Sequence, residues 1–173
     1  EWDKIWTKTW LMACSSTDIK EVGDYFNFKI GKESIIVMRS SEDSVHAFYN
    51  VCPHRGNRLF FDDFGFVKDI GCRFHGWKFN LDGTNQQVTD SETFREEVLC
   101  FDLNLSKVKV EEECGFIWVS MNDNIVPVRE YLGEVAKHLD LYEIDKMNVI
   151  RHAKSDWAAN WKTGLESFYE TYH

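Results

Sequence analysis

The sequence predicts an α+β protein in which a small all-β domain precedes the beginning of a mixed α/β domain. Two observations lead to this fold class. Short runs rich in β-branched and aromatic residues, separated by Gly and Asp turns, follow one another up to about residue 121. After Pro127, apolar residues instead recur at helical spacing. We place the boundary near residue 125, which divides the chain into domains at 1–125 and 126–173.

The chain opens on a short predicted helix. Trp2, Trp6 and Trp10 recur every fourth residue, which places them on one helical face that packs on a core. Strands separated by turns at Gly23 and Gly31 should follow. They are expected over 25–30, 34–38 and 45–51.

The second half of the β domain is predicted from a turn, a polar stretch and two apolar runs. Asp82-Gly83 is a hairpin signal, and residues 85–97 should form a long loop. Alternation over 101–110 and the hydrophobic run 114–121 predict the last two strands of the domain.

Beyond the boundary, three elements are expected. Val128, Leu132, Val135 and Leu139 share one face, so an amphipathic helix should begin at Pro127. Residues 147–157 have the pattern of a strand, and the last segment, from residue 160, reads as a helix.

Two short loops carry the metal-ligand signal. Cys52 and His54 form a Cys-x-His pair, and after seventeen intervening residues Cys72 and His75 form a Cys-x-x-His pair. Two thiols and two imidazoles at such spacing favour zinc or an iron–sulfur centre. Zinc sites more often use Cys-x2-Cys or His-x3-His pairs, whereas a cluster whose two irons are ligated differently needs one Cys-His pair on each loop.

The loops resemble those of Rieske proteins. The resemblance implies a [2Fe–2S] cluster with Cys52 and Cys72 on one iron and His54 and His75 on the other. Respiratory Rieske proteins carry an additional cysteine in each loop, which these loops do not have. The Cys-Pro-His-Arg-Gly run is similar to that of the oxygenase class, which works at low potential. Trp77 follows the second loop and is expected to cover the site, the core, or both.

Composition limits the class of partner and the compartment. The chain has 29 acidic and 20 basic residues and a net charge of −9, which argues against a nucleic-acid-binding protein. No apolar run approaches the roughly 20 residues of a membrane span, and no signal peptide is recognisable. Three cysteines outside the motif are expected to be reduced thiols in a cytoplasmic protein. They are Cys14, Cys100 and Cys114.

The last predicted helix carries a second set of candidate ligands. Glu166, Glu170 and His173 share one helical face, which by itself is more often a solvated surface than a metal site. The segment Asn-Trp-Lys at 160–162, followed by Glu170-Thr-Tyr-His173, resembles the start of the mononuclear iron motif of Rieske non-haem iron oxygenases. Members of that family most often have Asp where this chain has Glu170.

Both motifs together identify the chain as similar to the N-terminal portion of the large (α) subunit of a Rieske non-haem iron aromatic ring-hydroxylating oxygenase. The resemblance implies that residues 126–173 begin a helix-grip-like catalytic domain, and that His173 binds a mononuclear Fe(II) that activates O2 to hydroxylate an organic, aromatic substrate. A second iron-binding His and a distant Asp would lie beyond His173.

The resemblance also implies partners. Electrons would come from a ferredoxin or a reductase. The subunit would form a homotrimer in which Glu170 joins His173 to the neighbour's His75. The resemblance leaves open whether a small β subunit is also bound. Two alternatives remain: an N- or O-demethylating monooxygenase, and a Rieske electron carrier without oxygen chemistry. A carrier would hold two irons per chain and an oxygenase three.

Overall fold

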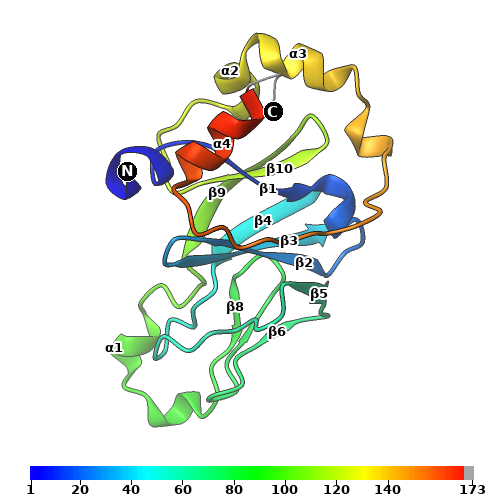
Figure 1. Cartoon of the computed structure of the whole chain (residues 1–173). Helices are drawn as coiled ribbons and strands as arrows, with labels where there is room; N and C mark the ends of the chain where they lie inside the picture. Colours follow the sequence, from blue (N-terminus) through cyan, green and yellow to red (C-terminus); the bar gives the residue numbers. More distant parts are fainter. Residues whose placement is uncertain (170–173) are drawn as a thin grey trace.

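Two antiparallel sheets form the framework of the structure, a computed structural model that describes residues 1–169 (Figure 1). The large sheet has the strand order β1-β10-β9-β4-β3-β2-β5, and the small sheet has the order β6-β7-β8. The large sheet contains β1 (Leu11–Ser15), β2 (Asp24–Ile30), β3 (Glu33–Ser41), β4 (Ser44–Tyr49), β5 (Phe64–Phe66), β9 (Lys107–Glu113) and β10 (Phe116–Ser120). The small sheet contains β6 (Ile70–Gly71), β7 (Lys78–Phe79) and β8 (Asn85–Gln87).

Helices are short and lie mostly at the two ends of the described chain. They are η1 (Trp2–Trp6), η2 (Ser16–Ile19), η3 (Ser91–Thr93), α1 (Glu96–Leu99), α2 (Val128–Leu132), α3 (Glu134–Asp140), η4 (Ile144–Lys146) and α4 (Trp161–Tyr169). The predicted all-β domain with helices after it is therefore confirmed, although β8, η3 and α1 interrupt the long loop expected over 85–97. In residues 1–169, no helix has both the length and the apolar character needed to cross a bilayer.

Strand β3 is the centre of the core because it is buried on both faces. Ile36 and Met38 point into the cluster of apolar side chains shared with the small sheet. Ile35 and Val37 point to the opposite face, where β1, β10 and η2 supply the contacts. A strand covered on both faces reads as an unbroken apolar run, which is what residues 35–38 show.

The lead-in helix is shorter than the tryptophan spacing predicts. It ends at Trp6, so Trp10 lies on the chain that enters β1. Trp10 is nevertheless buried, packed with Trp118 and Val128, and its indole N–H donates to the carbonyl of Val126 at 2.8 Å. The core role of Trp10 is confirmed, but its place on one helical face with Trp2 is wrong.

The amphipathic helix predicted after Pro127 is broken in two. Gly133 separates α2 from α3 and adopts φ +55°, a conformation that glycine takes without the steric cost of a Cβ atom. Val128 is fully buried, whereas Val135 is exposed. The predicted helical conformation is confirmed on both sides of Gly133, but the glycine ends the first helix.

The strand predicted over 147–157 is wrong. These residues, which we call the return segment, are extended but pair with no strand, because they run across the face of the large sheet rather than along an edge (Figure 1). His152 anchors the segment: its Nε2 lies 2.9 Å from Asp18 Oδ1, and its ring centre lies 6.3 Å from that of Phe26 and 6.0 Å from that of Phe64. Side-chain contacts thus replace a backbone ladder.

Helix α4 sits beside η1, at the end of the molecule remote from the small sheet (Figure 1). The Trp161 indole N–H donates to Glu1 Oε2 at 2.9 Å, and its ring meets that of Trp6 edge-on, with ring centres 4.9 Å apart. Lys162 forms an ion pair with Glu1. The start of α4 is therefore fixed to the beginning of the chain.

Candidate metal centre

The two predicted ligand loops have the same backbone conformation. Loop 1 (residues 52–57) follows β4, and loop 2 (residues 72–77) joins β6 to β7. In each loop the N–H of a glycine four residues after the cysteine donates to that cysteine's carbonyl: Gly56 to Cys52 and Gly76 to Cys72, both at 2.9 Å. Gly56 and Gly76 have φ +70° and +74°, in the left-handed region that side chains with a Cβ disfavour.

A second backbone hydrogen bond joins the first and last residues of each loop. The N–H of Cys52 donates to the carbonyl of Asn57, and the N–H of Cys72 donates to the carbonyl of Trp77, both at 2.8 Å. Each cysteine is therefore held by two hydrogen bonds within its own loop. The matching hydrogen bonds give the two loops equivalent positions for their cysteines and glycines, whereas His54 lies two residues after its cysteine and His75 three.

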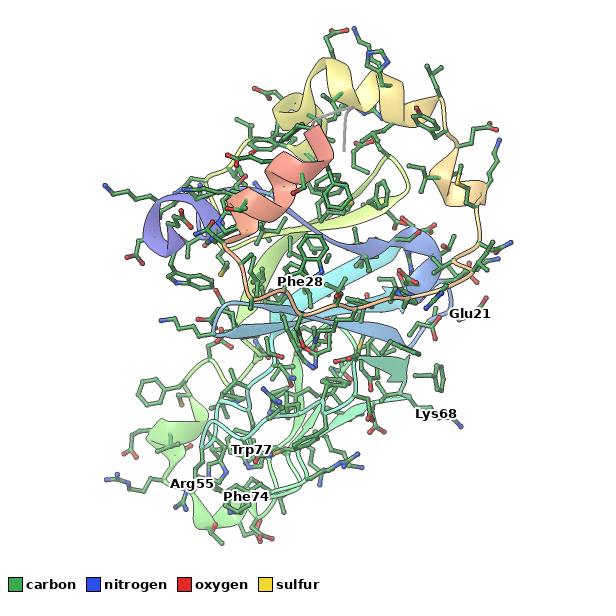
Figure 2. The ribbon with its side chains drawn as sticks, viewed as in Figure 1. Glu21, Phe28, Arg55, Lys68, Phe74 and Trp77 are labelled. Atoms are coloured by element: carbon green, nitrogen blue, oxygen red, sulfur yellow. The ribbon has the colours of Figure 1, made fainter. Side chains whose placement is uncertain are left out.

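The loops bring all four predicted ligands together, with the thiols inside and the imidazoles outside. Cys52 and Cys72 are 1% and 4% exposed. His54 and His75 are half-buried, and their rings meet edge-on with centres 4.6 Å apart. Figure 2 shows Arg55, Phe74 and Trp77, residues of these loops, gathered at one end of the molecule. The histidine side of the site therefore faces the surface.

In the described residues, the four loop side chains do not form a group of three donor atoms within 4.8 Å of one another. In the described part of the chain, the group of three ligand-type side chains with donor atoms within 4.8 Å of one another is Glu113, Cys114 and Asp140, away from these loops. Ligands of one tetrahedral zinc, with metal–sulfur distances of about 2.3 Å, lie about 3.8 Å apart. One Cys-His pair on each of two loops instead matches a group with two metal atoms.

The loop backbone favours a deprotonated sulfur at Cys72. Burial by itself would raise the pKa of the Cys72 thiol, but hydrogen bonds from the backbone N–H groups of Phe74 and His75, together with those from the Cys52 and Asn57 side chains, lower the pKa overall. Burial raises the pKa of the neighbouring Cys52 to about 11. Metal ligation requires both thiols to lose their protons, so the N–H groups around Cys72 favour binding of a cationic metal group.

Aromatic rings shield the histidine side of the site. The Trp77 ring stacks on that of His54, with centres 4.8 Å apart and planes 7° apart, and Phe94 meets both rings edge-on at 6.0 Å. Trp77 is also 3% exposed and part of the core. Both roles expected for Trp77 are present, and Phe94 is a contact that the sequence did not reveal.

Asn50 lies beneath loop 1 and supports it, a role that the sequence did not reveal. It is 6% exposed, and its Oδ1 accepts hydrogen bonds from the N–H groups of Leu59 at 3.0 Å and Phe60 at 2.8 Å. Its Nδ2 donates to the carbonyl of Phe60 at 2.7 Å and to Ser34 Oγ at 3.1 Å. Asn50 thereby joins the chain entering loop 1 to the chain leaving it. A polar residue at the end of an apolar strand was the available signal.

The other two candidate residues, Glu170 and His173, lie outside the described residues. The helix that leads to them, α4, is described up to Tyr169.

An antiparallel β fold that presents one Cys-His pair on each of two matching loops defines an iron–sulfur protein. Residues 9–110 match the profile of the Rieske [2Fe-2S] domain, which is more than half of the chain, and the chain belongs to that family. It is homologous to the N-terminal portion of the large subunits of Rieske oxygenases.

Three similar proteins illustrate the relationship. The chain is 30% identical over 170 residues to the glycine betaine monooxygenase oxygenase subunit of Pseudomonas aeruginosa, covering 98% of the chain and 39% of that protein. The quaternary ammonium Rieske monooxygenase CntA, solved with its substrate L-carnitine, is 30% identical with a TM-score of 0.87, covering 99% of the chain and 49% of CntA. Naphthalene 1,2-dioxygenase with indole bound in its active site is 35% identical with a TM-score of 0.71, covering 79% of the chain and 31% of that enzyme. The chain thus spans less than half the length of each of these relatives.

Proposed function

We propose that the chain is the N-terminal part of the large subunit of a Rieske monooxygenase that oxidises a quaternary ammonium compound. Cys52 and Cys72 bind one iron of a [2Fe–2S] cluster, and His54 and His75 bind the other. The cluster supplies one-electron transfer. The chain's own contribution is to bury the sulfur side, to hold His54 under Trp77, and to bring His75 to the surface where electrons can leave.

One observation carries the choice of substrate class. The solved quaternary ammonium monooxygenase superposes on 99% of the chain, α2 to α4 included, with a TM-score of 0.87, whereas naphthalene 1,2-dioxygenase superposes on 79% with a TM-score of 0.71. In sequence, the carnitine monooxygenase subunit of Escherichia coli and the benzene 1,2-dioxygenase α subunit of Pseudomonas putida both align with 100% of the chain, at 32% and 29% identity. The structural likeness to the quaternary ammonium enzyme therefore extends into the region after the cluster domain. This favours the N-demethylating alternative over the aromatic hydroxylation first expected. The proposed reaction inserts one oxygen atom of O2 into an N-methyl C–H bond, and two electrons and two protons reduce the other oxygen atom to water.

The iron site belongs to the same proposal. Residues 1–125 carry the cluster, and residues 126–173 begin the catalytic domain, in which His173 binds a mononuclear Fe(II). Glu170 is proposed to join this site to a cluster. Electrons come from a ferredoxin or a reductase.

The arrangement of α4 supports transfer between subunits. Within one chain, α4 lies at the opposite end of the large sheet from the ligand loops (Figures 1 and 2). A cluster therefore serves the iron of a neighbouring copy more readily than the iron of its own chain. The homotrimer implied by the family resemblance provides that neighbour.

Substrate-dependent oxygen uptake tests the proposal. The full-length protein, with iron counted and with a reductase or a chemical electron donor, is supplied with L-carnitine, glycine betaine, benzene or naphthalene. We expect three irons per chain, and at least about tenfold faster O2 uptake with one of the quaternary ammonium compounds than without substrate. Uptake driven by the aromatic compounds alone would restore the aromatic assignment. Two irons per chain and no uptake with any substrate would identify an electron carrier.

A further inference from the structure

At one equivalent position in each ligand loop, the side chain contacts a predicted ligand of the other loop. The fifth residue after each cysteine is Asn57 in loop 1 and Trp77 in loop 2, and in both cases its carbonyl accepts the hydrogen bond that closes the loop. Each side chain then crosses to a ligand of the other loop. Trp77 stacks on His54, and the Asn57 amide reaches the sulfur of Cys72.

In its contact with Cys72, Asn57 donates a hydrogen bond through its amide nitrogen. Its Nδ2 lies 3.9 Å from Cys72 Sγ and 2.8 Å from the carbonyl oxygen of Arg58. A side-chain amide nitrogen carries two hydrogens, so one can serve the carbonyl and the other the sulfur. The carbonyl of Arg58 thereby fixes the direction in which the second N–H points.

A donor at a ligating sulfur affects the two oxidation states of a cluster differently. Reduction adds one negative charge, part of which resides on the sulfur ligands, so an N–H donor stabilises the reduced state more than the oxidised state. Hydrogen bonds to sulfur are among the determinants of iron–sulfur potentials. Cys72 is buried, and in such surroundings each N–H dipole acts with little screening by water.

We propose that Asn57 raises the reduction potential of the cluster by donating a hydrogen bond across the loops to the sulfur of Cys72. This inference rests on the proposed ligation of the cluster by Cys72. Asn57 of loop 1 thus acts on the iron that is bound by Cys52 and Cys72. Trp77 of loop 2 orients His54, a ligand of the other iron.

A redox titration of the full-length, cluster-loaded protein followed by electron paramagnetic resonance tests this role. Asn57→Ala removes the donor but keeps the backbone carbonyl that closes loop 1. We expect the equilibrium constant for reduction to fall about threefold, which is about 28 mV for a one-electron couple. Asn57→Asp keeps the shape and replaces the donor with a negative charge, so it should lower the potential further. A potential equal to or above that of the wild type in either loaded variant would overturn the proposal.

Asn80→Ala is the matched control. Asn80 is exposed on the chain that follows β7, and its side chain donates to Thr84 Oγ1 at 2.9 Å rather than to a site residue. Its replacement should leave the potential unchanged.

A second test uses the wild-type protein, so its result does not depend on whether a variant folds. With ¹⁵N in the asparagine side-chain amides, the reduced cluster should show a weak ¹⁵N coupling, which a hydrogen bond to Sγ transmits; absence of the coupling would refute the contact. Iron and labile sulfide are determined first. A chain without a [2Fe–2S] cluster contradicts the proposed ligation, whereas a loaded cluster with an unchanged potential contradicts only the role of Asn57.

Discussion

Replacement of Cys72 by serine is expected to abolish the cluster. The purified Cys72→Ser variant of the full-length protein should contain neither labile sulfide nor the iron bound by these loops, and its reduced form should lack a Rieske signal in electron paramagnetic resonance. The physical reason is that the proposed cluster is held by one Cys-His pair on each loop, and a serine hydroxyl is a far weaker ligand for iron than a thiolate. Wild-type protein should contain two irons and two sulfides at this site.

The same variant should also loosen the small sheet. Strands β6, β7 and β8 are two or three residues long, so they have few ladder hydrogen bonds of their own. Loop 2 lies between β6 and β7, and metal binding there contributes to folding. Amide hydrogen exchange should therefore speed up over residues 70–87 more than over β3. Cys100→Ser is the control, because Cys100 is an exposed thiol outside the site. A Cys72→Ser protein that keeps two irons and labile sulfide would contradict the ligand assignment, and so would a wild type that binds one zinc and no sulfide.

Replacement of Asn50 by leucine should be the most destabilising change outside the ligands. Leucine has nearly the same volume, but it leaves the buried N–H groups of Leu59 and Phe60 and the carbonyl of Phe60 without their partner. Each unsatisfied buried group costs about 1–3 kcal/mol, so the total loss should be at least about 3 kcal/mol, a large part of a typical folding free energy. The urea midpoint followed by circular dichroism should fall by more than about 1 M. Loss of cluster absorbance should accompany this unfolding or precede it.

Asn124→Leu provides the comparison, since Asn124 is exposed in the turn after β10. Its midpoint should stay close to that of the wild type, as is usual for surface substitutions. An Asn50→Leu protein as stable as the Asn124→Leu protein would show that the four hydrogen bonds of Asn50 contribute little to folding or to loop 1.

The features that the sequence predicted correctly are those encoded by local spacing. The Cys-x-His and Cys-x-x-His pairs, with a glycine four residues after each cysteine, carry their loop geometry within a few residues, so the structure places them as expected. Likewise, the apolar run at 35–38 predicts a strand whichever elements cover it. Gly133 was also visible, and it should have ended the predicted helix.

The features that escaped prediction depend on distant partners. Residues 147–157 have a strand-like pattern, but whether a strand forms depends on a free edge alongside it, and here the segment crosses a face and is held by Asp18. Asn50 and Asn57 look alike in the sequence as ordinary polar residues near a motif. Only the folded chain shows that one is buried under loop 1 and that the other reaches the sulfur of loop 2.

The separation of the ligand loops from α4 has a genetic consequence. If each cluster serves the iron of a neighbouring chain, then a defect in the cluster stops the reaction at the neighbour's iron, whereas a defect in the iron site stops it in the subunit that carries the defect. A subunit that lacks Cys72 still offers an intact iron to its neighbour, and a subunit that lacks His173 still offers an intact cluster. Two alleles that are each inactive alone would then complement one another when they are co-expressed, because mixed rings contain pairs in which both centres are whole.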